Sequence, residues 1–202
     1  MAFIPEPKET AVLIVDVQND FCHPDGMLGK FGKDVSSGEL VTPNIVKLIA
    51  YAKKTSVPVL FINTHHDLIT DSPAWRGRIL YDENKIICHT GSWGAENYMV
   101  DKKDADYLII KNRYSGFHQT NLDLILRSIG RKNLLICGFA TNVCVETTLR
   151  DANAHDYFPA LVTDCSGSFS DEEHLFGIQN VQRYFGYTIS LQEVKQFWGV
   201  ED

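Results

Sequence analysis

The amino-acid sequence predicts an α/β fold with a central, mostly parallel sheet. Short runs of apolar and β-branched residues alternate with segments of helical periodicity, the pattern of consecutive βαβ units. The central runs are almost continuously apolar, as expected of strands covered on both faces. The chain has 202 residues, 44% of them hydrophobic, and no linker-like stretch or repeat divides it. We therefore expect a single domain over residues 1–202.

Each element follows from a local signal. Strands are expected over residues 11–16, 58–63, 107–111, 133–138 and 160–163, with a weaker candidate at 187–190. Helices are expected over residues 42–54, 120–129, 143–154 and 172–185. Thr42 and Thr120 are the expected starts of the first two, and Gly130 follows the end of the second. Long irregular segments at 21–38 and 68–96 follow strands, where binding sites are usually built.

Composition excludes several classes of function. A net charge of -7 argues against a general nucleic-acid binder, which needs a basic face. We see no signal peptide and no apolar run near the roughly 20 residues of a membrane span, so we expect no membrane association. The five cysteines are odd in number and contain no CxxC pair, which disfavours a disulfide framework or a thiolate zinc site. A reducing, cytoplasmic setting and no cofactor are the expectation.

Three residues of catalytic type fall at the ends of predicted strands. Asp16 ends AVLIVD, Lys111 ends YLIIK, and Cys144 follows NLLIC at the start of a predicted helix. Ligands of parallel sheets bind outside the carboxyl ends of the strands. A helix start and a nearby lysine lower a thiol pKa, so we expect Cys144 to be a thiolate nucleophile. Lys111 would stabilise the thiolate, and Asp16 would carry protons to the leaving amine and from water.

Each residue also has an ordinary structural explanation. Cysteines near strand–helix junctions are more often buried apolar fillers, a strand-end lysine can reach solvent, and Asp16 can cap a turn. The coincidence of Asp, Lys and Cys at three separate strand ends favours a nucleophile site over three unrelated roles.

Longer motifs around these residues are similar to those of a known protein family. VLIVDVQNDF, KNRYSGFHQTNLDLILRSIG and GFATNVCVETTLRDA resemble the isochorismatase-like cysteine hydrolases, over about residues 11–168. The resemblance implies a three-layer α/β/α fold of Rossmann-like topology, and a catalytic triad of Asp16, Lys111 and Cys144. It also implies a cis peptide between Phe139 and Ala140, and an oxyanion hole formed by the N–H groups of Ala140 and Cys144. Members of this family often form homodimers or homotetramers.

The resemblance also narrows the chemistry. Cys144 favours C–N hydrolysis through a thioester over the vinyl-ether cleavage of true isochorismatases, which generally lack this cysteine. The motifs are most similar to the ureidoacrylate and carbamoyl amidohydrolases, so a small ureido or carbamoyl amide is the expected substrate. The alternatives are a vinyl-ether hydrolase and a catalytically inert binding or assembly member of the same fold.

Candidate substrate contacts follow from this branch of the family. Asn63 and Tyr114 resemble residues that hydrogen-bond the ureido group, and Phe21, Trp93 and Phe117 could wall the pocket. A strand-end turn for Asn63 and ordinary packing for the aromatic residues remain equally open.

A metal site is not expected. Nicotinamidases carry an Asp-x-His metal motif after their second strand, and here Asn63 replaces its carboxylate. His65 or His66, with His89, would make a poor hard-metal site without that ligand.

Overall fold

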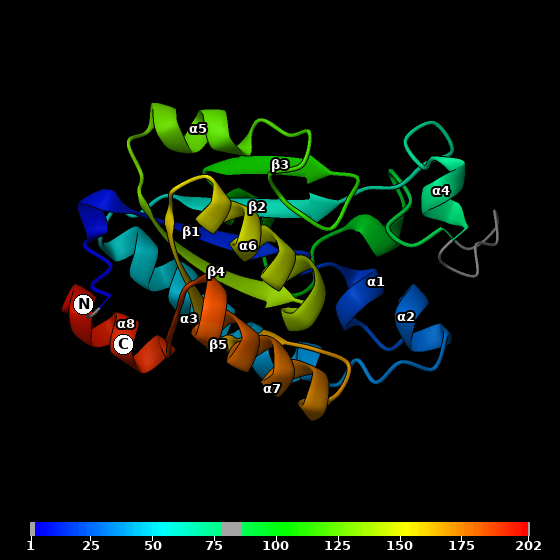
Figure 1. Ribbon diagram of the computed structural model, residues 1–202. Coiled ribbons are helices and arrows are strands. Elements are labelled where there is room, and N and C mark those ends of the chain that lie inside the picture. The colour runs from blue at the N-terminus through cyan, green and yellow to red at the C-terminus, as the bar shows by residue number, and fades with distance from the viewer. Residues whose placement is uncertain (1–2, 78–85, 202) are drawn as a thin grey trace.

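A six-stranded parallel sheet forms the centre of the molecule within the described residues, 3–77 and 86–201, of this computed structural model (Figure 1). The strand order is β3-β2-β1-β4-β5-β6, and every neighbouring pair is parallel. The strands are β1 (Thr10–Val15), β2 (Val59–Thr64), β3 (Tyr107–Lys111), β4 (Asn133–Phe139), β5 (Phe158–Gly167) and β6 (Tyr187–Ile189). The predicted sheet is confirmed, although β5 is longer at both ends than predicted.

Helices cover both faces of this sheet, which makes the three-layer arrangement implied by the resemblance (Figure 1). Side chains of α3 (Ser37–Lys54) and α8 (Leu191–Trp198) belong to one apolar cluster. Those of α5 (Leu122–Ser128) and α6 (Glu146–Ala154) belong to the other. The remaining α-helices are α1 (Asn19–Cys22), α2 (Met27–Lys30), α4 (Pro73–Arg76) and α7 (Asp171–Asn180).

Strand β1 shows why both faces must be covered. Val12 and Ile14 pack into the first cluster, whereas Leu13 and Val15 pack into the second. Successive side chains of a strand point to opposite faces, so a strand that is apolar throughout needs a helix layer on each side. The near-continuous apolar runs in the sequence reflect this two-sided burial.

Helix starts differ from prediction in several places. Helix α5 begins at Leu122, two residues after the predicted start Thr120. Helix α3 begins at Ser37, ahead of the predicted cap Thr42, and contains Pro43 in its interior. The Thr42 hydroxyl donates 2.6 Å to the Gly38 carbonyl one turn earlier, so Thr42 lies inside the helix. The helix predicted over 143–154 is preceded by a π-helical turn, Thr141–Val145, which contains Cys144.

The two long loops hold short helices. The segment 21–38 contains α2, and the segment 68–96 contains α4 and a 3₁₀ turn at Trp93–Ala95. Residues 78–85 of the second segment lie outside the described residues.

The C-terminal helix packs on the body of the protein. Trp198 is buried, and its indole N–H donates 2.7 Å to the carbonyl of Pro5. Its neighbour Phe197 remains half exposed. Across the part of the chain that the structure describes, no helix combines the length and apolar character needed to cross a membrane.

Candidate active site

Three side chains meet where β1, β3 and β4 end at the carboxyl edge of the sheet. The Lys111 ammonium donates 2.8 Å to Oδ2 of Asp16 and lies 3.5 Å from Sγ of Cys144. The side chains of Asp16 and Lys111 are fully buried. The structure therefore brings together the three residues that the sequence singled out.

Close packing of two strand ends places these residues together. Gly138 of β4 lies opposite Val15 of β1, and it has a φ of +117°. A Cβ at Gly138 would lie 2.0 Å from the Val15 carbonyl oxygen, so only glycine fits. Asp16 itself adopts a left-handed φ of 53°, a conformation that aspartate tolerates better than most residues. The chain thus turns sharply at the end of β1, where the Asp16 carboxylate joins the site.

Thr64 links the carboxylate to the ammonium. Its backbone N–H and its hydroxyl donate to Oδ1 of Asp16 at 2.9 and 2.8 Å. The same hydroxyl accepts a 2.6 Å hydrogen bond from Nζ of Lys111. Thr64 and Lys111 are also direct neighbours in the β2–β3 register. Sequence reasoning missed Thr64, although a polar residue ending a buried strand was a usable signal.

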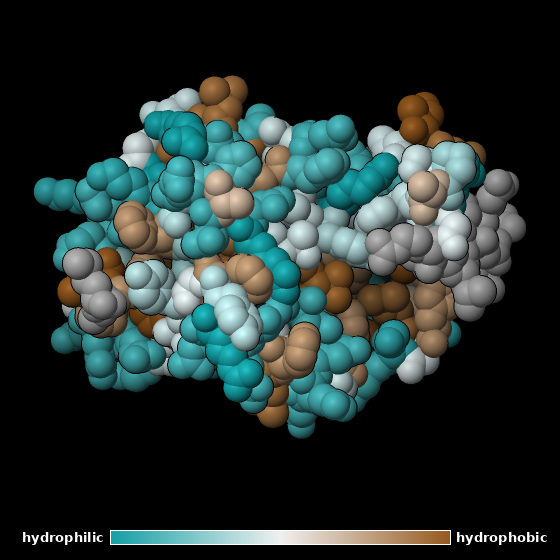
Figure 2. Space-filling model, in the orientation of Figure 1, coloured by the Kyte–Doolittle hydropathy of each residue, from teal (hydrophilic) through white to brown (hydrophobic). Residues whose placement is uncertain are grey.

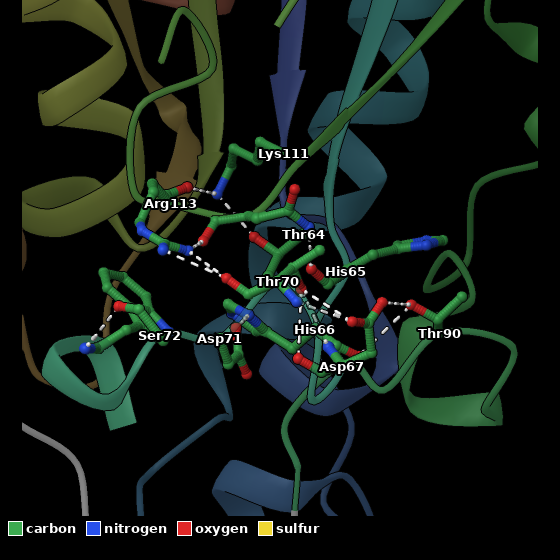
Figure 3. A network of polar contacts seen from close by, with 12 residues as sticks. Thr64, His65, His66, Asp67, Thr70, Asp71, Ser72, Thr90, Lys111 and Arg113 are labelled. Atoms are coloured by element: carbon green, nitrogen blue, oxygen red, sulfur yellow. Dashed lines mark hydrogen bonds and ion pairs between the residues drawn. The ribbon is translucent and has the colours of Figure 1, made fainter. Parts of the chain in front are cut away.

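The Lys111 ammonium is held from a third side. It donates 3.1 Å to the backbone carbonyl of Arg113, and Figure 3 shows its contacts with Arg113 and Thr64. Oxygen atoms of Asp16, Thr64 and Arg113 therefore all accept from it. An ammonium has three N–H donors, which these oxygens share with the Cys144 sulfur. Lys111 is consequently fixed beside the thiol.

The electrostatics of the thiol differ from prediction. Burial raises the pKa of Cys144, the Asp16 carboxylate raises it further, and Lys111 only partly offsets this. The expected lowering of the thiol pKa is therefore wrong, because burial disfavours the charged form. Burial also opposes the charge on Lys111, but Asp16 and Cys144 leave the pKa of Lys111 above its ordinary value. These shifts favour the protonated thiol of Cys144 beside the ammonium of Lys111.

A cavity of about 310 Å³ opens onto Cys144. Phe21 and Tyr114, both predicted substrate contacts, line it, as does Ala140. Apolar side chains from α2 and α4 complete much of the wall, including Leu28 and Trp75. Figure 2 shows hydrophobic side chains gathered in a hollow between the parts of the surface where α2 and α4 lie in Figure 1. The site is suited to a small organic molecule.

Ala140 adjoins the predicted backbone feature. The Phe139–Ala140 peptide is cis, as the resemblance implied. The Ala140 carbonyl accepts hydrogen bonds from the N–H groups of Val143 and Val145, at 3.0 and 3.2 Å. The turn that carries Cys144 is thereby tied to the end of β4.

Comparison with known proteins agrees with this geometry. The sequence model of the isochorismatase domain family matches residues 10–193. The chain belongs to the isochorismatase family. It is 34% identical to the ureidoacrylate amidohydrolase RutB of Pseudomonas syringae pv. syringae over 208 residues, which cover 93% of this chain and 83% of that protein. It is 32% identical to the enzyme of the same name from Methylobacterium radiotolerans, over 96% of this chain and 81% of that protein.

Solved structures of other proteins show the same fold. A cysteine hydrolase from Pseudomonas syringae pv. phaseolicola superposes with a TM-score of 0.88 at 25% identity, covering 98% of this chain and 96% of that chain. A nicotinamidase from Bacillus subtilis superposes with a TM-score of 0.74 at 23% identity, covering 90% and 99%. The second likeness concerns the fold alone.

Three predicted substrate contacts lie away from the cavity that opens onto Cys144. Asn63 precedes Thr64 on β2, so its side chain points to the other face and donates 2.7 Å to Asn97 in a separate pocket. Phe117 is buried in the apolar core, stacked on His155 at 5.2 Å. Trp93 is 47% exposed and contacts His23 edge-on. The structure does not bring these three side chains to Cys144.

The histidines weighed as metal ligands do not form a ligand cluster, although the backbones of His66 and the exposed His89 pair in a β-bridge. His65 lies in the separate pocket with Asn63. His66 lines the main cavity, and its Nδ1 is 2.7 Å from Oδ1 of the buried Asp71. Within residues 3–77 and 86–201, no three His, Cys, Asp or Glu side chains come close enough to hold a metal ion. The residues present do not fit the metal site of the nicotinamidase branch.

Sequence reasoning missed further residues of the cavity wall. The Arg113 guanidinium lies 4.8 Å from the ring centroid of Trp75, which in turn contacts Tyr114. Arg113 also donates to the carbonyl of Thr70 (Figure 3). It donates to the carbonyl of Asn112 as well. These contacts bring α4 against the segment after β3, which no local sequence pattern reveals.

Proposed function

We propose that this isochorismatase-family protein is a cysteine-dependent amidohydrolase that cleaves the C–N bond of a small ureido or carbamoyl amide. The observation that carries the proposal is the contact of Lys111 with both Asp16 and Cys144, beside a cavity of small-molecule size. The amidohydrolase names of relatives at 32–34% identity support it. Ureidoacrylate, named for those relatives, is the first substrate to test.

The proposed reaction begins at the thiol of Cys144. Asp16 takes the proton of Cys144, and Sγ bonds to the substrate carbonyl carbon, whose oxygen becomes an oxyanion. The backbone N–H groups of Ala140 and Cys144 are proposed to stabilise this oxyanion. Lys111 stabilises the thiolate as it forms. The raised pKa of Cys144 means that deprotonation accompanies attack, with Asp16 as the base.

The two following steps release the products. Asp16 returns its proton to the nitrogen, the C–N bond breaks, and the acyl group remains as a thioester on Cys144. Asp16 then deprotonates a water, which attacks the thioester and frees the thiol and the acid. Phe21 and Tyr114 of the cavity wall are the proposed substrate contacts.

Replacement of Cys144 tests this function. Cys144→Ala should abolish ammonia release from ureidoacrylate, biuret, nicotinamide or carbamoyl amino acids while the melting temperature stays close to that of wild type. Cys137→Ala is the matched control, because Cys137 packs on the opposite face of the sheet and should keep activity. No ammonia from any amide, with pyruvate formed from isochorismate by both wild type and Cys144→Ala, would indicate vinyl-ether hydrolysis instead.

The compartment and the oligomeric state of the enzyme are also part of what we propose. We propose one catalytic domain over residues 1–202 in a reducing cytoplasm, a setting that the five free cysteines support. We also propose a homodimer or homotetramer. Exposed apolar side chains on and after α7, at Leu175, Phe176 and Tyr184, support self-association. Light scattering at micromolar concentration measures the state directly.

A further inference from the structure

Side chains at and after the end of β2 alternate between two pockets. Thr64 and His66 line the main cavity, whereas Asn63 and His65 line the separate pocket. The backbone N–H of His65 donates 3.0 Å to the carbonyl at the end of β3, so the extended pairing continues past Thr64. Successive side chains of an extended chain point to opposite faces, which explains the alternation. His66 therefore lies on the same side as the triad, about 7 Å beyond Thr64 along the chain.

The imidazole ring is the part of His66 that faces this cavity. The backbone N–H of His66 donates to the Cys88 carbonyl, and its carbonyl accepts from the Thr90 N–H, both at 3.0 Å. Nδ1 of the ring lies 2.7 Å from Oδ1 of Asp71, whose side chain is only 2% exposed (Figure 3). An ionised carboxylate can only accept, and a buried one needs a donor, so Nδ1 carries a hydrogen toward Asp71.

The second ring nitrogen of His66 is open to a ligand. Nε2 has no hydrogen-bond partner within residues 3–77 and 86–201. The side-chain atoms of this region that are fully covered and lack a partner do not include Nε2, so it is accessible. The His66 side chain as a whole is 10% exposed. The ring therefore presents one accessible hydrogen-bonding atom at the wall of the main cavity.

Positively charged groups lie near this ring. The Trp75 ring centroid is 5.7 Å from that of His66, and the Arg113 guanidinium lies 4.8 Å from the same Trp75 centroid. Arg113 donates to backbone carbonyls, and among the described residues no carboxylate pairs with it. Lys33, also on the wall, is exposed. The carboxylate of Glu173 opposes these cations, but its Oε2 atom is covered by protein. The wall therefore favours a ligand with a negative charge.

We propose that His66 is a specificity-determining residue, which selects ureido substrates with a carboxylate tail beyond the scissile carbonyl. This inference rests on the proposed function, and ureidoacrylate carries such a tail. An imidazolium donates from both nitrogens, so His66 holds Asp71 on one side and the ligand carboxylate on the other. In a three-carbon ureido acid, four bonds separate the reacting carbonyl carbon from the carboxyl carbon, about 5 Å. That reach suits a side chain one strand repeat beyond Thr64.

Three ureas of similar length test the inference. They are 3-ureidopropionate, propylurea and (3-aminopropyl)urea, whose tails are anionic, neutral and cationic. We expect wild type to prefer the anionic over the neutral urea by about 10-fold or more in kcat/KM, mainly through KM, because the tail does not react. His66→Gln should remove most of this preference and change propylurea turnover little. His65→Gln is the matched control and should behave as wild type, because His65 faces the separate pocket.

Asp71→Asn is a second variant for the same contact. It keeps an acceptor for Nδ1 of His66 but removes the charge behind the ring. We expect KM for 3-ureidopropionate to increase several-fold and KM for propylurea to stay close to that of wild type. Thermal melting shows whether each variant is folded, and Asp71→Asn decides in the same way if His66→Gln is not.

The outcomes separate this inference from the proposed function. Equal turnover of the three ureas, or an equal loss on all three in His66→Gln, overturns the specificity role but leaves amide hydrolysis standing. A preference kept in His66→Gln and lost in Arg113→Met also overturns it, because the guanidinium would then hold the tail. If wild type releases no ammonia, the proposed function fails on these substrates. Calorimetric binding to Cys144→Ala then decides: an anion preference lost in Cys144→Ala/His66→Gln supports the inference, and no preference overturns it.

Discussion

Thr64 donates two hydrogen bonds to one oxygen of Asp16. Its backbone N–H and hydroxyl reach Oδ1 at 2.9 and 2.8 Å, which leaves Oδ2 for Lys111. The carboxylate is therefore oriented before any substrate binds. We regard Thr64 as a positioning residue, acting through Asp16 and Lys111.

Thr64→Val tests that role. It keeps the shape of the side chain but loses the hydroxyl. Because hydrogen bonds to charged groups are worth about 1.5–3 kcal/mol, we expect kcat to fall about 10- to 100-fold. Thr64→Ser should recover most of the loss. Ammonia-release kinetics measure the effect, and thermal melting shows whether the fold is kept. Full activity in Thr64→Val would remove Thr64 from the mechanism.

Selective alkylation of Cys144 is a second prediction. All five cysteines are buried, but only Cys144 is assigned to the wall of the main cavity in the described structure. Iodoacetamide should label it first, as peptide mass spectrometry would show. Burial raises the pKa of Cys144 above its ordinary value of 9.0, so the thiolate fraction and the labelling rate should still be increasing with pH at that value. A rate already constant at neutral pH would contradict the raised pKa.

Asp16→Asn should separate thiol reactivity from turnover. The Asp16 charge raises the pKa of Cys144, so its removal lowers that pKa and should speed alkylation at neutral pH. Turnover should fall by about 10²- to 10⁴-fold, because the general base is lost. Alkylation and ammonia-release assays on the same variant measure the alkylation rate and the turnover rate. Slower alkylation in this variant would mean that Lys111 no longer supports the thiolate.

The complete capping box of α8 predicts a pH-dependent stability. Hydrogen bonds from Ser190 hold the pKa of Glu193 below its ordinary value of 4.5. The stabilisation is therefore present above that value and is lost as the pH falls through the lower, folded-state pKa. Glu193→Gln should reduce the free energy of unfolding by about 0.3–1 kcal/mol at neutral pH and by less in acid.

Urea unfolding at about pH 7 and pH 3 measures the Glu193 effect. Glu173→Gln is its matched control. Ser170 and Glu173 open α7 with the same spacing as Ser190 and Glu193, but α7 lacks the hydrogen bond from the serine N–H to the glutamate side chain. A pH-dependent loss of the same size in Glu173→Gln would show that Glu173 caps α7 in solution.

The fold and the grouping of Asp16, Lys111 and Cys144 were accessible from sequence because both depend on chain order. Apolar runs at regular intervals predict parallel strands, and Asp16, Lys111 and Cys144 each stand at or just after the end of one. The carboxyl ends of parallel strands share one edge, so position along the chain was enough to group these residues.

The sequence did not reveal structural details that change with a shift of one or a few residues along the chain. Asn63 was the predicted contact, yet its neighbour Thr64 faces the triad, since adjacent side chains point to opposite faces. The start of α3 was missed for a related reason. The pair Thr42–Pro43 is typical of a helix start but here lies inside the helix.

The sequence by itself determined the parallel sheet and the identity of the three residues at its edge, because strand periodicity and strand ends are local properties. Tertiary structure alone decided the raised pKa of Cys144 and the contacts of Thr64 with Asp16 and Lys111. Each of these depends on burial and on partners distant in the chain, and folding alone brings those partners within reach.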